Sequence, residues 1–219
     1  TGAFMVGHIC RFDPAYALAK RHIDEGKIGK ILSIYARRNI PAAVSQSVLA
    51  SISPFMGDGV HDVDIMLWYT GSAVESVYAQ AIDVRGLAHP DIGWSMYRFV
   101  GGAVGVTENN WCLPPGTPFE LDARMEVVGD KGAIYINSPG QPLAINTADG
   151  WRYPDTVYWP RMETGRTGAL KEELTYFAGC ILKGEKPGII TPEESRAAVA
   201  AVEAAERSAQ TGEIVRITK

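Results

Sequence analysis

The feature that most constrains the fold is a series of strand-like segments in the middle of the chain. They cover 73–84, 93–100, 103–112, 119–128, 133–137 and 143–146. Gly101-Gly102 separates one pair of segments and Gly129-Asp130-Lys131-Gly132 another, and both strings are typical of tight turns. Strands joined by tight turns pair antiparallel, because parallel neighbours need long crossover connections. The sequence therefore predicts an antiparallel sheet.

Helices are predicted on both sides of these strands. Asp13-Pro14 is typical of a helix start and Gly26 of a helix end, since acids favour the N-cap and proline the first turn. Thr191-Pro192-Glu193-Glu194 is a capping box that begins the helix over 195–209. The remaining predicted elements are a strand over 27–40, a loop over 41–54, a helix ending at Gly71, a helix over 168–182 and a strand over 213–217.

This order of elements predicts an α+β fold with one large, mostly antiparallel sheet and helices packed on one face. No internal repeat or low-complexity linker divides residues 1–219, so a single domain is expected. Segments 73–79 and 96–100 are fairly apolar on both sides. The second sheet face is therefore expected to pack against another copy of the chain, and the alternative is that long loops cover it.

Bulk composition excludes several classes of partner. The net charge is −4 and no run of Lys or Arg occurs, so nucleic acid is not expected. No apolar run approaches the roughly 20 residues of a membrane helix. The three cysteines are far apart and odd in number, which disfavours a disulfide framework or a zinc site and suits a cytoplasmic protein with reduced thiols.

The richest chemical motif surrounds His61, which lies among Asp58, Asp62 and Asp64 at the start of a helix. A histidine with acidic neighbours suits an acid/base role, because its charge changes near neutral pH and the carboxylates can orient it. An alternative, about equally weighted, is a core histidine with Asp58 as the helix N-cap. A metal site is the least favoured interpretation, since few ligand types converge in sequence.

Other side chains are candidates for holding a substrate. We take Arg38, Tyr97 and Arg161 as candidate substrate-binding residues, the arginines because a guanidinium binds hydroxyls or an acidic group. Four tryptophans are candidates for a sugar-stacking wall, or equally for the core or an interface: Trp94, Trp111, Trp151 and Trp159. The string 101–105 is rich in glycine but lacks the Gly-x-Gly-x-x-Gly spacing, and a strand follows it, so it is not a phosphate loop.

Five short strings, in order along the chain, resemble the C-terminal domain of the glucose-fructose oxidoreductase, inositol dehydrogenase and MocA-like family. They are Val6 to Pro14, Gly26-Lys27-Ile28-Gly29-Lys30-Ile31, His61-Asp62-Val63-Asp64 with Trp68-Tyr69-Thr70-Gly71, Gly129 to Ile134, and the closing helices around Thr191-Pro192-Glu193. The resemblance implies an NAD(P)-dependent oxidoreductase acting by hydride transfer on a sugar, polyol or derivative. It also implies that His61 is the active-site histidine, and that the open sheet face forms a homodimer or homotetramer.

Two departures from the family pattern shape the expectations. The family binds NAD or NADP in an N-terminal Rossmann domain, and no glycine fingerprint of such a domain occurs here. The chain alone is therefore expected not to bind the cofactor and to be inactive. The family often has an aspartate four residues before the histidine, where this chain has Gly57, with Asp58 one residue later. The alternative function is a non-catalytic, ligand-sensing or regulatory protein of the same fold.

Overall fold

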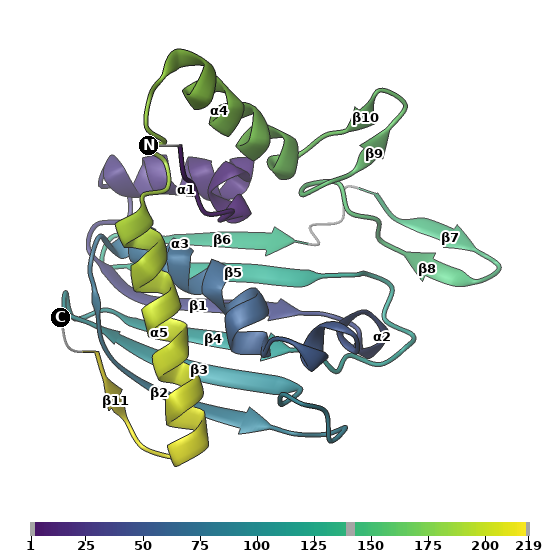
Figure 1. Cartoon of the computed structure of the whole chain (residues 1–219), viewed down its shortest axis with the longest axis horizontal. Helices are drawn as coiled ribbons and strands as arrows, with labels where there is room; N and C mark the ends of the chain where they lie inside the picture. Colours follow the sequence, from purple (N-terminus) through teal and green to yellow (C-terminus); the bar gives the residue numbers. More distant parts are fainter. Residues whose placement is uncertain (1–2, 139–142, 218–219) are drawn as a thin grey trace.

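The computed structural model describes residues 3–138 and 143–217. Seven of its strands form one sheet in the order β11-β2-β3-β4-β1-β5-β6, and Figure 1 shows helices α3 and α5 lying across one face of it. The strands of this sheet are β1 (Ile31–Asn39), β2 (Val74–Ile82), β3 (Ile92–Phe99), β4 (Val104–Asn110), β5 (Asp122–Gly129), β6 (Ala133–Ser138) and β11 (Val215–Arg216).

The helices and small hairpins complete the fold. Two two-stranded sheets, β7–β8 and β9–β10, extend from the main body together. The α-helices are α1 (Pro14–Asp24), α2 (Ala42–Ser45), α3 (Val60–Thr70), α4 (Ala169–Lys183) and α5 (Pro192–Thr211). The shorter helical segments are η1 (Ile9–Phe12), η2 (Val48–Ala50) and the π-helical η3 (Phe55–Gly59), and the hairpin strands are β7 (Ile145–Thr147), β8 (Gly150–Arg152), β9 (Arg161–Met162) and β10 (Gly165–Arg166).

The predicted α+β fold with a mostly antiparallel sheet is confirmed, with one correction. Strand β1 lies between β4 and β5 and pairs parallel with β4, Ser33 opposite Val104 and Arg37 opposite Glu108. The turn signals predicted only the hairpins between consecutive strands, whereas β1 reaches its partners across about 70 residues of chain. This single parallel pair places the carboxyl ends of β1 and β4 next to each other.

The core lies between the sheet and the two helices that cross it. Helix α5 presents a small apolar face, with Ala198, Ala201 and Ala205 fully buried, which lets the helix approach the strands closely. Its capping box is present as predicted, with Thr191 accepting from the Glu194 amide and Glu194 from the Thr191 amide. Helix α3 ends at Gly71 with φ of 57°, a left-handed conformation that favours glycine.

The opposite face of the sheet carries no described helix (Figure 1). One row of side chains crosses it by direct pairing of neighbouring strands, and this row is mainly apolar. Its members are Tyr78, Met96, Val106, Tyr35, Glu126 and Tyr135. Met96 is 54% exposed and Tyr135 65% exposed. The described loops therefore leave this face open, contrary to the alternative in which they cover it.

Candidate active site

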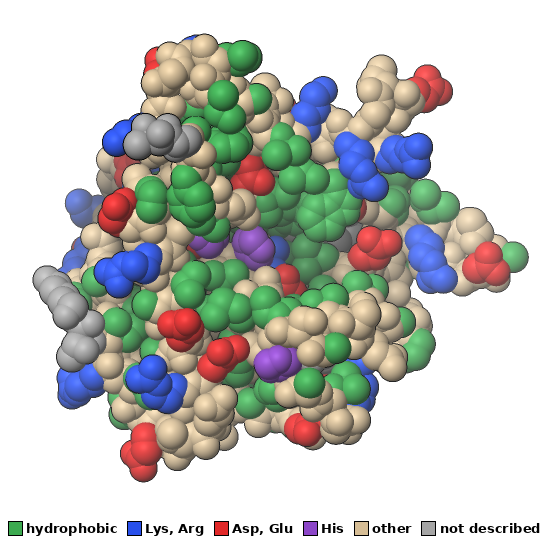
Figure 2. All heavy atoms as spheres, in the orientation of Figure 1, with side chains coloured by type: hydrophobic (Ala, Val, Ile, Leu, Met, Phe, Trp, Pro, Cys, Tyr) green, Lys and Arg blue, Asp and Glu red, His purple; other side chains and the backbone are tan. Residues whose placement is uncertain are grey.

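A cavity of about 450 Å³ opens at the carboxyl ends of β1 and β4. Ligands of open sheets that contain parallel strands bind at this end of the strands. Figure 2 shows histidine and hydrophobic atoms at the surface in the depression between the sheet layer and the helices α1 and α4. The lining residues are Ile9, Arg38, Ile40, Val44, Val48, Ile52, Gly57, Asp58, His61, Trp111, Glu120, Leu121, Tyr158 and Trp159.

His61 lies in the first turn of α3 and lines this cavity. Its Nδ1 atom is buried and has no hydrogen-bond partner within the described ranges. Burial lowers the pKa of His61 to about 3, and the positive charge of Arg38 and the nearby His8 act in the same direction. The imidazole is therefore neutral at pH 7, with a nitrogen available to accept a hydrogen bond.

A second histidine packs directly against His61, and the sequence pattern did not reveal this contact. The His8 ring meets the His61 ring edge-on, with 6.1 Å between centroids and an interplanar angle of 89°. His8 is only 2% exposed, and neither of its ring nitrogens has a hydrogen-bond partner in the part of the chain described. Burial lowers the pKa of His8 as well, against the opposing charge of Asp64. The two rings thus form a neutral pair, with His8 buried and His61 partly exposed at the cavity.

The expectation that Asp62 and Asp64 orient His61 is wrong. Both carboxylates are fully buried and each is neutralised by an arginine. Arg38 donates from Nη2 to Asp62 Oδ1 at 3.0 Å, and Arg11 holds Asp64 through two bonds of 2.7 and 2.9 Å. Neither aspartate bonds to the imidazole. Arg38 on β1 engages Asp62 instead, and Arg11 on η1 engages Asp64. Two buried ion pairs therefore anchor α3 beneath the cavity.

Asp58 does not cap α3, since helix η3 leads directly into α3 without a side-chain cap. Its Oδ2 atom instead accepts a hydrogen bond of 2.6 Å from Trp111 Nε1. Burial raises the pKa of Asp58 to about 6, against the opposing effects of Arg38 and the Trp111 bond. Asp58 and His61 line the same cavity, so the structure brings together the two residues predicted to be catalytic.

The surroundings of Gly57 disfavour a side chain at this position, where the family pattern often has an aspartate, whereas this chain has its aspartate one residue later, at Asp58. A Cβ atom at Gly57 would lie 2.3 Å from Cη2 of Trp111, far inside van der Waals contact. The Trp111 ring thus fills the space into which a side chain at position 57 would project. An aspartate at that position requires the indole to move, whereas Asp58 uses the same indole as its hydrogen-bond donor.

The three predicted substrate-binding residues lie in different surroundings. Arg38 lines the cavity, although its Nε and Nη2 atoms are engaged with Asp62. Tyr97 is sealed in the core at 1% exposure and does not line the cavity, because position 97 points to the helix-covered side of β3. Arg161 is exposed on β9 and is also absent from the lining. Of the three, only Arg38 lines the cavity.

Two of the four tryptophans considered for a sugar-stacking wall lie at the cavity. Trp111 and Trp159 line it, together with Tyr158. Trp94 lies on the open sheet face and Trp151 on β8, at 40% and 53% exposure. Tyr158 and Trp159 reach the site on the irregular segment between β8 and β9. No local pattern in the sequence indicates where this segment lies.

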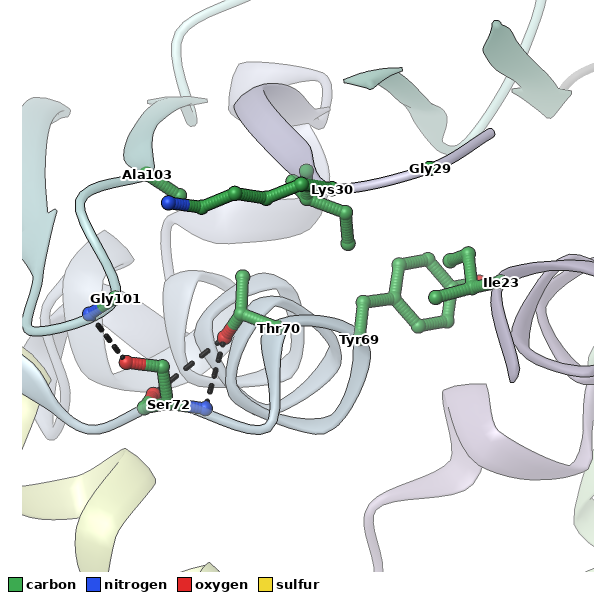
Figure 3. A pocket seen from close by; sticks show the side chains of 9 residues that line it. Ile23, Gly29, Lys30, Tyr69, Thr70, Ser72, Gly101 and Ala103 are labelled. Carbon is green, nitrogen blue, oxygen red and sulfur yellow. Dashed lines mark hydrogen bonds between the residues drawn. The ribbon is translucent and has the colours of Figure 1, made fainter. Parts of the chain in front are cut away.

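A second pocket, of about 260 Å³, lies at the other end of α3 (Figure 3). Its polar groups are mostly engaged with one another. Gly101 N donates to Ser72 Oγ at 2.8 Å, Ser72 N donates to Thr70 Oγ1, and Tyr69 OH donates to the Tyr16 carbonyl. No carboxylate or histidine lines this pocket, so the cavity at His61 is the better candidate for chemistry.

Two kinds of feature are absent from the described residues. None of the helices there has the length and apolar character needed to cross a membrane. Among the same residues, no cluster of three or more histidine, cysteine or acidic side chains is arranged to hold a metal ion. Cys10, Cys112 and Cys180 are free thiols.

The low pKa of His61 predicts a specific acid sensitivity. Between pH 6.5 and about 3 the unfolded chain protonates this histidine and the folded chain does not, so stability falls as pH falls, by at most about 1.4 kcal/mol per pH unit. His61→Gln should remove this contribution. Between pH 6.5 and 4.5 its free energy of unfolding should therefore fall by roughly 2 kcal/mol less than that of the native chain. Urea unfolding at the two pH values measures it. His22→Gln is the control, because the His22 side chain is 52% exposed, and equal losses in all three proteins would contradict the prediction.

The fold belongs to a known class of domain. The family model of the GFO/IDH/MocA C-terminal domain matches residues 16–135, which is more than half of the chain, and the chain is a member of that family. Among its relatives is the scyllo-inositol 2-dehydrogenase (NAD(+)) of Bacillus subtilis, 34% identical over 83% of this chain and 53% of that protein. Inositol 2-dehydrogenase 2 of Saccharopolyspora erythraea is 29% identical over 94% of this chain and 59% of its own length.

Solved structures show the same fold. The myo-inositol 2-dehydrogenase of Lactobacillus plantarum superposes with a TM-score of 0.81 at 20% identity, over 99% of this chain and 65% of that one. The scyllo-inositol dehydrogenase of Lactobacillus casei with bound NAD(H) and scyllo-inositol gives 0.76 at 22% identity, over 98% and 64%. The chain thus spans between half and two thirds of the length of these proteins.

Proposed function

We propose that this chain is the substrate-binding domain of an NAD(P)-dependent oxidoreductase that acts by hydride transfer on a sugar, a polyol or a derivative. The observation that carries the proposal is the placement of His61 and Asp58 together in one cavity at the carboxyl ends of β1 and β4. Membership of the family and the inositol dehydrogenases among the relatives support it. We further propose that residues 1–219 form one domain, and that the three free thiols suit the cytoplasm.

The described residues do not fit a dinucleotide. A Rossmann site needs a strand, a glycine-rich turn and a helix whose N-terminus faces the pyrophosphate. Strand β1 leads through Ile40 and Pro41 into the one-turn helix α2, and β4 leads into a loop. We therefore propose that NAD or NADP is bound by an N-terminal domain outside this chain, and that the 219 residues alone are inactive. When bound, the cofactor would supply the acceptor for hydride.

The residues of this chain would handle the substrate hydroxyl and its proton. His61 is neutral, so its ring N–H can donate to the hydroxyl oxygen. This bond orients the carbon that loses hydride and leaves the hydroxyl proton free. Arg38 lies nearby and disfavours a positively charged imidazole, so the proton is better placed on a carboxylate. Asp58, with its pKa of about 6, is ionised at neutral pH and can take it up. The Trp111 bond holds that carboxylate in place.

The test is hydride transfer by a longer protein that includes this chain and a nucleotide-binding domain. Reduction of NAD+ or NADP+ by members of a panel of inositols and sugars is the expected result. Saturable binding of a polyol without reduction of either cofactor would favour the regulatory alternative. The 219-residue chain alone serves as the control that should show no reduction.

Asp58 makes the pH profile of this reaction predictable. Oxidation should require the ionised carboxylate, so kcat/KM should rise with pH and level off above an apparent pKa of about 6. In Asp58→Asn that rise should disappear, and the plateau rate should fall by roughly 10²-fold or more. Glu120→Gln is the control, because Glu120 lines the cavity rim in an exposed position. An unchanged profile in Asp58→Asn would remove this residue from the proton path.

We also propose that the open sheet face forms a homodimer or homotetramer. Support comes from the mainly apolar row through Met96 and Tyr135, which is broad and uncovered. Met96→Glu places a charge in the middle of this row and should convert the oligomer to a monomer at micromolar concentration in sedimentation. Met162→Glu, at a residue 58% exposed on β9, is the matched control and should leave the assembly intact. A monomeric native chain would contradict the proposal.

A further inference from the structure

The walls of the cavity at His61 are mainly apolar, which is unusual for a site that has to hold a fully hydroxylated ring. Aliphatic side chains come from several separate elements, among them Ile9, Ile40 and Leu121. Two more, Val44 on α2 and Val48 on η2, stand at 49% and 40% exposure. Trp159 contributes an aromatic surface that is 42% exposed. A ligand in this cavity would therefore meet hydrocarbon over most of its surface.

The polar groups of the cavity are fewer than the apolar ones, and several are already engaged. Asp58 has one oxygen engaged by Trp111, and Arg38 uses Nε and Nη2 on Asp62. His61, the exposed Glu120 and the Tyr158 hydroxyl, which has no hydrogen-bond partner among the described residues, remain for a ligand. These groups can partner some hydroxyls of a ligand, and hydrocarbon forms the rest of the wall. Hydroxyls placed elsewhere in the cavity would lose their water without gaining a partner, which disfavours binding strongly.

We infer that this cavity selects a sugar or polyol that carries an alkyl or aryl substituent, with the substituent seated against Val44, Val48 and Trp159 and a hydroxyl presented to His61 and Asp58. The inference rests on the proposed function only in taking that hydroxyl as the reacting group. Aromatic and aliphatic side chains together favour such a substituent, because burial of hydrocarbon is the dominant attractive contribution available in this cavity.

Binding to the 219-residue chain tests the inference without any cofactor. The probes are phenyl β-D-glucopyranoside, D-glucose and scyllo-inositol, titrated while the indole N–H signals of the five tryptophans are followed by NMR. The phenyl glucoside should bind at least about tenfold more tightly than either unsubstituted compound. Its shifts should be largest at Trp111 and Trp159, which line the cavity.

A matched pair of variants distinguishes binding in the cavity from nonspecific binding to exposed tryptophans. Trp159→Ala should weaken phenyl glucoside binding by about tenfold or more. Trp151→Ala should leave it unchanged, since Trp151 is similarly exposed, at 53%, but lies outside the lining. Both side chains are surface-exposed, so both variants should fold, and their remaining indole signals check this.

Three results would overturn the inference: no saturable binding of the phenyl glucoside, equal affinity for all three compounds, or equal effects of the two tryptophan variants. The first or second result would indicate that the exposed apolar residues Val44, Val48 and Trp159 contact a protein surface and not a ligand. Tight, Trp159-dependent binding by a chain whose longer form transfers no hydride would keep the inference and remove the proposed function. The two failures are therefore distinguishable.

Discussion

Arg11→Met is expected to destabilise the domain by about 3–5 kcal/mol, because it leaves the carboxylate of Asp64 buried without its partner. The two side chains are each 1% exposed and are joined by bonds of 2.7 and 2.9 Å. Arg11 also donates to the Ile189 carbonyl at 2.7 Å and to Glu194 at 3.1 Å. The substitution thus uncouples η1 from both α3 and the start of α5.

Chemical unfolding of the native chain and its variants measures this loss. Arg124→Met is the control, since Arg124 pairs with Asp122 at 2.9 Å but is 45% exposed, and such pairs contribute only about 0–1 kcal/mol. The double variant Arg11→Met/Asp64→Leu should recover much of the stability, because it removes the unpaired charge. If Arg11→Met lowers the free energy of unfolding no more than Arg124→Met does, the Asp64 carboxylate must be hydrated or paired with another group in the variant.

His61→Ala is expected to lower turnover of the longer protein by at least about tenfold, because the reacting hydroxyl loses the group that orients it toward Asp58. Cofactor binding should stay near normal, because we propose that the cofactor is bound by a separate nucleotide-binding domain. Steady-state rates with the best polyol of the panel, together with a cofactor titration, measure the two quantities. His22→Ala, on the exposed side of α1, should match the native enzyme.

A structural role for His61 would give a different result. Loss of the His8 contact would then lower stability while the rate per folded molecule stayed constant. His61→Gln keeps a side-chain N–H donor and separates the two roles, since it should retain more activity than His61→Ala if orientation of the hydroxyl matters. Unchanged turnover in both variants would reduce His61 to a packing residue.

Local signals in the sequence predicted the elements of the fold well. Asp13 caps α1 through the Ala15 amide, the 129–132 turn closes with the Gly129 amide bonding to the Gly132 carbonyl, and the Thr191 capping box is formed. Each of these interactions joins residues within four positions, so the amino acids that make it can be read side by side.

Long-range contacts decided what the sequence could not show. The parallel β1–β4 pair depends on which strands meet after the chain has folded. At the site, His61 and Asp58 were predicted from one motif, but the bond from Trp111 to Asp58 spans 53 positions, and so does the ion pair of Arg11 with Asp64. Tyr97 was misplaced because strand alternation alone does not say which face is covered.

The place of β1 in the sheet has a consequence for how the protein is made. Strand β1 is the first strand in the chain, yet both of its neighbours, β4 and β5, come at least 65 residues later. During synthesis on the ribosome its apolar residues, Ile34 and Ala36 among them, have no strand edge to join until β4 has emerged. Such a topology slows folding and prolongs exposure to aggregation, so the yield of active protein should depend on chaperones and on the speed of translation across residues 40–130.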